Sequence, residues 1–93
     1  MPNNGKSRQS LVARWVEANP DDPWEGEARV KATGVPVWAL IGYLPAVGND
    51  VEQVAIDYEL PVEAVEAAVA YYNKHRTAID VRLEQNAAFD MHR

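Results

Sequence analysis

Cysteine is absent from the chain, and histidine occurs only twice. Without cysteine the protein has no disulfide, no Cys-based zinc site and no thiol nucleophile. His75 and His92 do not follow the His-x-x-His or Glu-x-x-His spacing of metal ligands, and a pairing of His75 with Asp80 is equally well explained by a solvated helix end. We therefore expect no catalytic residue, no metal and no cofactor, and the sequence does not predict an enzyme.

Long hydrophobic runs are also missing. The longest apolar stretch, residues 35–47, is interrupted by prolines and a glycine and is far shorter than the ~20 residues that a membrane span needs. The first ten residues contain no apolar segment of the signal-peptide type. These features predict a cytoplasmic protein that does not insert into a membrane.

Basic residues are lacking from the middle of the chain. Residues 32–73 contain six Asp and Glu but no Lys or Arg, whereas residues 1–31 carry five of each sign and residues 74–93 carry four bases and three acids. Because phosphate neutralisation supplies most of the affinity of a DNA-binding protein, the middle segment would repel DNA. Only the two ends could attract it.

The 93 residues suit one domain with one hydrophobic core. Apolar spacing predicts a helix from Ser10 to about Asn19, and Val37, Leu40, Ile41 and Leu44 mark the buried face of a second helix. Two further helices are predicted to form a helix-turn-helix-like pair. The first buries one face, made of Val51, Val54, Ala55 and Tyr58, and the second starts near Val62. The predicted fold class is mainly α, a small helix-turn-helix-like domain with a minor β element near residues 29–37 and a long or two-part C-terminal helix. We divide the chain into a flexible leader (1–9), this domain (10–76) and a C-terminal helical tail (77–93).

The C-terminal helix allows two interpretations. Apolar and polar side chains recur in steps of three and four at Val62, Val65, Val69, Tyr72, Arg76, Ile79, Leu83 and Asn86. If the helix is unbroken through Asn73 and Lys74, this row is a heptad seam about 37 Å long. Alternatively, the first half packs on its own domain and the second half merely follows it.

Two segments of the chain resemble one known family. The residues concerned are Ala32, Thr33, Gly34, Val35, Pro36 and Val37 in a turn, then Gly48, Val51, Val54, Ala55, Asp57, Tyr58 and Leu60, and finally Val65, Ala67, Ala68, Tyr71 and Tyr72. In this order they resemble domain-of-unknown-function family 433 (DUF433), whose members look like antitoxins of VapBC-type toxin–antitoxin pairs. One departure is that the usual Gly-Thr-Arg of the family reads Ala32-Thr33-Gly34.

The resemblance implies an antitoxin that neutralises a PIN-like ribonuclease toxin and autoregulates its operon. PIN-like nucleases hold metal in a cluster of acids, and a guanidinium pairs well with carboxylates. The C-terminal residues expected to bind the partner on this basis are Arg76, Ile79, Arg82, Leu83, Phe89 and Arg93. Any contact with operator DNA is expected from an N-terminal arm, with Lys6, Arg8 and Arg14.

The second helix of the helix-turn-helix pair is poorly suited to contact DNA bases. Its exposed positions are expected to be Glu63, Glu66, Ala64 and Ala67, whereas DNA readers present Arg, Lys, Asn or Gln to base edges. We therefore expect this pair of helices to serve packing and homodimer formation, through the short strands or the C-terminal helix. Two other functions stay open, a stand-alone DNA-binding transcriptional regulator and a structural dimerisation module.

The aromatic residues divide between the core and the surface in the predicted fold. Trp15 and Trp38 are predicted to fill the core, and Trp24, in a proline-rich loop, to lie at the surface. Tyr72 continues the inward row Val62–Val65–Val69, which leaves Tyr71 at the edge of the core or at an interface.

Overall fold

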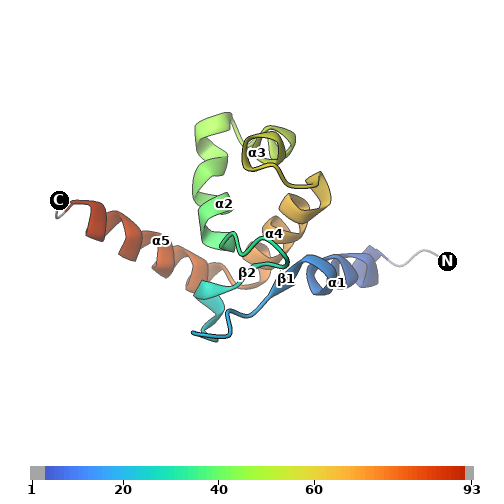
Figure 1. Ribbon diagram of the computed structural model, residues 1–93, viewed down its shortest axis with the longest axis horizontal. Helices are drawn as coiled ribbons and strands as arrows, with labels where there is room; N and C mark the ends of the chain where they lie inside the picture. Colours follow the sequence, from blue (N-terminus) through green and yellow to red (C-terminus); the bar gives the residue numbers. More distant parts are fainter. Residues whose placement is uncertain (1–3, 92–93) are drawn as a thin grey trace.

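A computed structural model describes residues 4–91 of the chain and the side chains of residues 9–88. Within this part the chain is mainly helical, as predicted. The elements are α1 (Asn4–Trp15), β1 (Val16–Glu17), η1 (Glu25–Glu27), β2 (Arg29–Val30), α2 (Val37–Tyr43), η2 (Leu44–Val47), α3 (Val51–Tyr58), α4 (Val62–Lys74) and α5 (Arg76–Met91), where η denotes a short 3-10 helix (Figure 1). No described helix is long and apolar enough to cross a membrane.

Helix α4 is the centre of the fold, because α1, α2 and α3 all pack against it. Ala64, Val65, Ala67 and Ala68 are completely or almost completely buried. The expectation that Ala64 and Ala67 are exposed is therefore wrong. Their small side chains let neighbouring helices pack closely on this face of α4. Val62, expected on the inner row, keeps 37% of its surface exposed at the start of the helix.

The first helix and the β element differ in detail from the predicted boundaries. Helix α1 begins at Asn4, within the segment predicted as a leader, and ends at Trp15 instead of near Asn19. The chain then turns extended, because β1 pairs antiparallel with β2 in a register that puts Val16 opposite Val30. Both valines are buried, and this burial outweighs continuation of the helix. The β element near residues 29–37 is confirmed, with a bridge between Arg29 and Pro36.

The turn between α3 and α4 explains the helix-turn-helix-like geometry. Asp50 caps α3 by accepting a hydrogen bond from the backbone N–H of Gln53 at 3.2 Å. Glu59 ends α3 in the left-handed region, with φ 58° and ψ 47°. Leu60 is then buried, and Pro61 precedes the first residue of α4. The chain reverses within three residues, so α3 lies against α4.

The C-terminal helix is in two parts. At His75, with φ −127° and ψ 42°, the helical conformation breaks between α4 and α5. The long heptad seam is therefore not one continuous helix. Ile79 still reaches the core with no exposed surface, but the later turns of α5 run away from the other helices (Figure 1). The whole molecule is elongated, with extents of 52 × 28 × 23 Å.

Candidate functional site

Three of the residues predicted to bind a partner are engaged by the fold itself. The Nε of Arg82 donates to Glu27 Oε2 at 2.7 Å, and its guanidinium lies 4.3 Å from the ring centre of Trp38. Ile79 is fully buried, and Leu83 packs against the core. These side chains lie where η1 and α2 pack against the first half of α5, and their binding of a partner stays a prediction.

The other predicted partner-binding residues are distributed differently. Arg76 is exposed; its guanidinium lies 5.1 Å from the ring centre of Tyr72, and its Nη2 donates to Asn73 Oδ1 at 3.3 Å. The side chains of Phe89 and Arg93 lie outside the described residues. Beyond Leu83, the described side chains Glu84, Gln85, Ala87 and Ala88 are exposed. We call residues 84–91 the α5 arm.

Three polar contacts hold the junction of α4 and α5. The hydroxyl of Tyr71 donates to the backbone carbonyl of Glu25 at 3.0 Å, and His75 Nδ1 lies 3.3 Å from Glu25 Oε1. The hydroxyl of Tyr72 donates to Asp80 Oδ1 at 2.9 Å. The pairing of His75 with Asp80 drawn from the sequence is therefore not formed. Both tyrosines are half-buried, so they do not divide into one inward and one edge residue.

These contacts also change the acidity of the two phenols. Burial raises the pKa of Tyr71 above its ordinary value, with a smaller contribution from the charge of Glu25. The hydrogen bond to Asp80 raises the pKa of Tyr72, although the nearby Arg76 opposes this effect. The neutral phenol is thus favoured at both positions, as the donated hydrogen bonds require.

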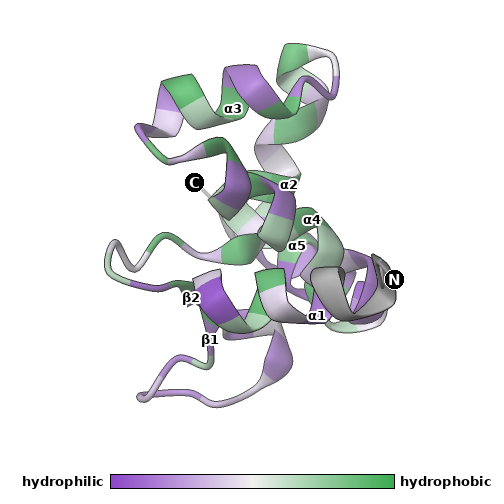
Figure 2. Cartoon of the chain, turned by 90° about the vertical axis from the view of Figure 1, so that its right-hand side faces the viewer, coloured by the Kyte–Doolittle hydropathy of each residue, from purple (hydrophilic) through white to green (hydrophobic). Residues whose placement is uncertain are grey.

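Helix α3, the turn after it and the start of α4 carry a second set of exposed side chains, at the end of the molecule occupied by α3 (Figure 2). Ile56 is 68% exposed and Val62 37% exposed. Glu52, Glu59 and Glu63 are exposed as well, and their side chains make no hydrogen bond or ion pair with another described residue. We call these five residues the turn face.

Asp57 differs from the acids of the turn face, because the fold uses its carboxylate. It accepts a hydrogen bond from the hydroxyl of Tyr43 at 2.6 Å and another from Gln53 Nε2 at 2.8 Å. The first of these bonds raises the pKa of Tyr43. Asp57 thereby links α3 to α2, and it is a structural residue.

The predicted DNA-binding residues all lie on α1. Arg14 is exposed in its last turn, and the side chains of Lys6 and Arg8 are outside the described part. Beside α1 a groove of about 630 Å³ opens towards the end of α4. It is lined by Gln9, Val12, Ala13, Ala70, Tyr71, Asn73, Lys74 and His75. Among the described residues no group of three or more His, Asp or Glu side chains could hold a metal ion.

Trp24 lies at the surface as predicted, whereas Trp15 and Trp38, predicted to fill the core, are partly buried at its edge. Trp24 is 37% exposed, and its ring covers Gly26 so closely that a Cβ there would lie 2.6 Å from it. Trp15 and Trp38 pack against the core. Their indole N–H groups are buried without a hydrogen-bond partner among the described residues, so these rings stabilise the fold through packing and, at Trp38, through the contact with Arg82.

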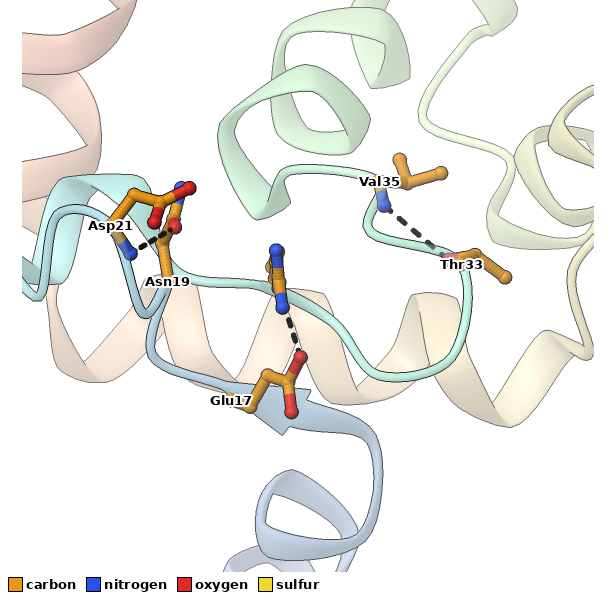
Figure 3. A network of polar contacts seen from close by, with 6 residues as sticks. Glu17, Asn19, Asp21, Thr33 and Val35 are labelled. Atoms are coloured by element: carbon orange, nitrogen blue, oxygen red, sulfur yellow. Dashed lines mark hydrogen bonds and ion pairs between the residues drawn. The ribbon is translucent and has the colours of Figure 1, made fainter.

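The turn that departs from the DUF433 pattern is strained at one position and open at another. Ala32 has φ 72°, a conformation that favours glycine, while Thr33 Oγ1 accepts from the N–H of Val35 at 3.3 Å (Figure 3). Gly34, where the family pattern has arginine, has φ 78° and no atom within 4 Å of a Cβ built there. A Cβ at this position would thus lie in open space, although the positive φ strains any residue other than glycine. Nearby, Arg29 pairs with Glu17 at 2.9 Å and anchors β2 to β1.

Comparison with known proteins gives one positive result. The model of the family described as "Protein of unknown function (DUF433)" matches residues 21–72, which is more than half of the chain. The searches of curated proteins and of solved structures found no match. The matched segment runs from the loop before η1 to the last turns of α4, and it excludes α1 and α5. The chain belongs to the DUF433 family.

Proposed function

We propose that this member of the DUF433 family is an antitoxin-like binding protein, which neutralises a PIN-like ribonuclease by placing the α5 arm over its active site. The observation that carries the proposal is the course of α5. The first half of the helix is fixed by Ile79 and Arg82, and the arm extends away from the domain for about 12 Å at 1.5 Å per residue (Figure 1).

The anchoring of α5 favours a binding role over a passive tail. Because Arg82 and Ile79 fix the root of the helix, the arm is presented in one direction, and less conformational entropy is lost when a partner binds. Arg76, exposed at the root, and Arg93, at the end of the chain, are the arginines that remain as candidates to face an acidic metal site. A cytoplasmic location and formation of a homodimer are part of the same proposal.

DNA binding is a secondary role in this proposal. Ala64 and Ala67 are buried and Glu63 and Glu66 are exposed, so α4 offers acids where a base reader needs donors. Operator binding would rely on the bases of α1, together with charge from the ribonuclease. The two alternative functions, a stand-alone DNA-binding regulator and a dimerisation module, are distinguished from the antitoxin function by the experiment below.

Co-purification tests the proposal directly. The chain is expressed together with the product of its neighbouring reading frame, with the affinity tag only on the neighbour. The expected result is a stoichiometric complex without ribonuclease activity. Ala87→Pro, which breaks the helix of the arm, is expected to restore cleavage of RNA, whereas the matched variant Ala87→Ser leaves it inhibited.

Two results would contradict the antitoxin. If no complex forms and the free protein retards its own upstream DNA at physiological salt, the protein is a stand-alone regulator. If it binds neither the neighbour nor DNA and is only a dimer, it is a dimerisation module.

A further inference from the structure

The turn face exposes apolar surface that the fold does not need. Helix α3 buries Val54 and Ala55 on its inner side, whereas Ile56 points outward with 68% of its surface in contact with solvent. Val62 repeats this exposure just after the turn. Large aliphatic side chains on both sides of one turn lose apolar contact that a docked partner would supply.

The charges of the turn face have one sign. Glu52 lies one helical turn before Ile56, Glu59 closes α3, and Glu63 stands in the first turn of α4 beside Val62. None of these three carboxylates has a polar partner among the described side chains. Glu59 even adopts a left-handed conformation in which glycine would be less strained. The helix dipole favours an acid at Glu52 and at Glu63, each in the first turn of its helix, but this effect needs no partner and leaves both carboxylates available on the surface.

Exposed aliphatic side chains together with acids of one sign favour one kind of partner. A surface with exposed carboxylates around aliphatic side chains repels nucleic acid and anionic lipid, and it fits a cationic surface that also contains an apolar recess. A ribonuclease has such a surface where it binds RNA, because Lys and Arg contact the phosphates and flat apolar side chains contact the bases.

We infer that the turn face occupies the RNA-binding groove of the ribonuclease, with the three glutamates in place of RNA phosphates and Ile56 and Val62 in place of bases. This inference rests on the proposed function and assigns a second contact to it. The arginines that flank the α5 arm, Arg76 and Arg93, would face the catalytic acids, and the turn face would exclude the substrate. The acidic helix-turn-helix then has a use that a basic one could not fulfil.

The two contacts can be tested separately, because the turn face lies at the α3 end of the molecule and the α5 arm leaves it elsewhere (Figures 1 and 2). The test variant is Glu59→Lys with Glu63→Lys. Its matched control is Asp21→Lys with Asp22→Lys, which changes two exposed loop acids and shifts the net charge equally. A third variant, Ile56→Ser, removes apolar contact without changing charge.

The measurements are the dissociation constant of the complex with the neighbour-encoded ribonuclease at several salt concentrations, and its competition by a short single-stranded RNA. The expected result is a rise in Kd of about tenfold or more for the charge reversal and a smaller rise for Ile56→Ser. The control is expected to bind like the wild type. The wild-type association rate should fall steeply with salt, and RNA should compete with the protein.

Failure of the inference and failure of the proposed function give different results. If the complex forms but all three variants bind like the wild type and RNA does not compete, the turn face is not the docking surface, although the antitoxin stands. If the wild type forms no complex, both proposals fall. Circular dichroism of each free variant, expected to match the wild type because the changed side chains are exposed, separates lost binding from lost folding.

Discussion

Helices α4 and α5 follow each other with one residue between them, yet they occupy opposite environments. Helix α4 is surrounded by three other helices and buries Ala64, Val65, Ala67 and Ala68 completely. Helix α5 is held along its first half only, where Ile79 is its one fully buried residue among those described. The same row of residues spaced in threes and fours runs through both. A regular seam in sequence therefore indicates helix but not where a helix ends or what it packs against.

The largest expected effect compares an alanine of each helix. Ala67→Glu places a carboxylate in a position with no exposed surface, and burying an unpaired charge costs more than most small domains can lose. We expect the variant not to fold, and Ala67→Val, which only overpacks the site, to lose about 1–3 kcal/mol. Ala87→Glu, on the exposed α5 arm, should change the free energy of unfolding by less than about 0.5 kcal/mol. Urea denaturation followed by circular dichroism measures all three, and equal losses at positions 67 and 87 would contradict the contrast.

The second comparison lies within α5. Ile79→Ala removes the fully buried side chain that roots the helix and should cost about 2–5 kcal/mol of unfolding free energy. Val81→Ala, two residues further on and 38% exposed, should cost less than about 1 kcal/mol. Thermal unfolding of both variants checks the difference. A small effect of Ile79→Ala would mean that α5 is not anchored by the core.

The sequence predicts those parts of the fold that depend on the local spacing of apolar residues. The buried faces of α2 and α3 follow from apolar residues at helical spacing, as Leu40 and Val54 illustrate. Ala64 and Ala67 were misplaced, because alanine fits either environment and only the number of surrounding helices decides. The break at His75 has no glycine or proline to mark it. It is accompanied by contacts to Glu25, about fifty residues earlier in the chain, which no local pattern reveals.

In the candidate site, too, local patterns are predictable from the sequence and long-range contacts are not. The exposure of the acids of the turn face was predictable for Glu63, because the helix periodicity places it outward. The engagement of Arg82 was not, because its partner Glu27 lies 55 residues away in sequence. An arginine in a C-terminal tail has the same appearance in the sequence whether it faces a partner or its own domain.

The third comparison uses the two described arginines of α5. Arg82→Ala removes a half-buried ion pair with Glu27 and the contact with the Trp38 ring, and we expect a loss of about 1–2 kcal/mol. Arg76→Ala, at an exposed position, should lose less than about 0.5 kcal/mol. A double-mutant cycle of Arg82→Ala with Glu27→Gln should show coupling between the two sites. Additive losses would mean that the ion pair does not contribute to stability.

The smallest expected effect concerns pH and the junction of the two helices. The pKa values of Tyr71 and Tyr72 are raised in the folded protein, so the unfolded chain loses these phenolic protons first as pH rises. The folded state then binds more protons than the unfolded state, and stability falls as pH rises above the ordinary tyrosine value of 10.0. Below that value these two groups leave stability unchanged.

The variant Asp80→Asn isolates the contribution of α5 to this titration. It removes the negative charge that accepts the hydrogen bond from Tyr72, so the pKa of Tyr72 should move down towards its ordinary value, while Tyr71, raised mainly by burial, should be unaffected. Titration by the ultraviolet absorbance of tyrosinate measures this shift against Glu84→Gln, which removes an exposed acid of the α5 arm. An unchanged Tyr72 in Asp80→Asn would show that α5 does not hold its first turn against α4 in solution. The α5 arm would then lack the fixed direction on which its proposed role depends.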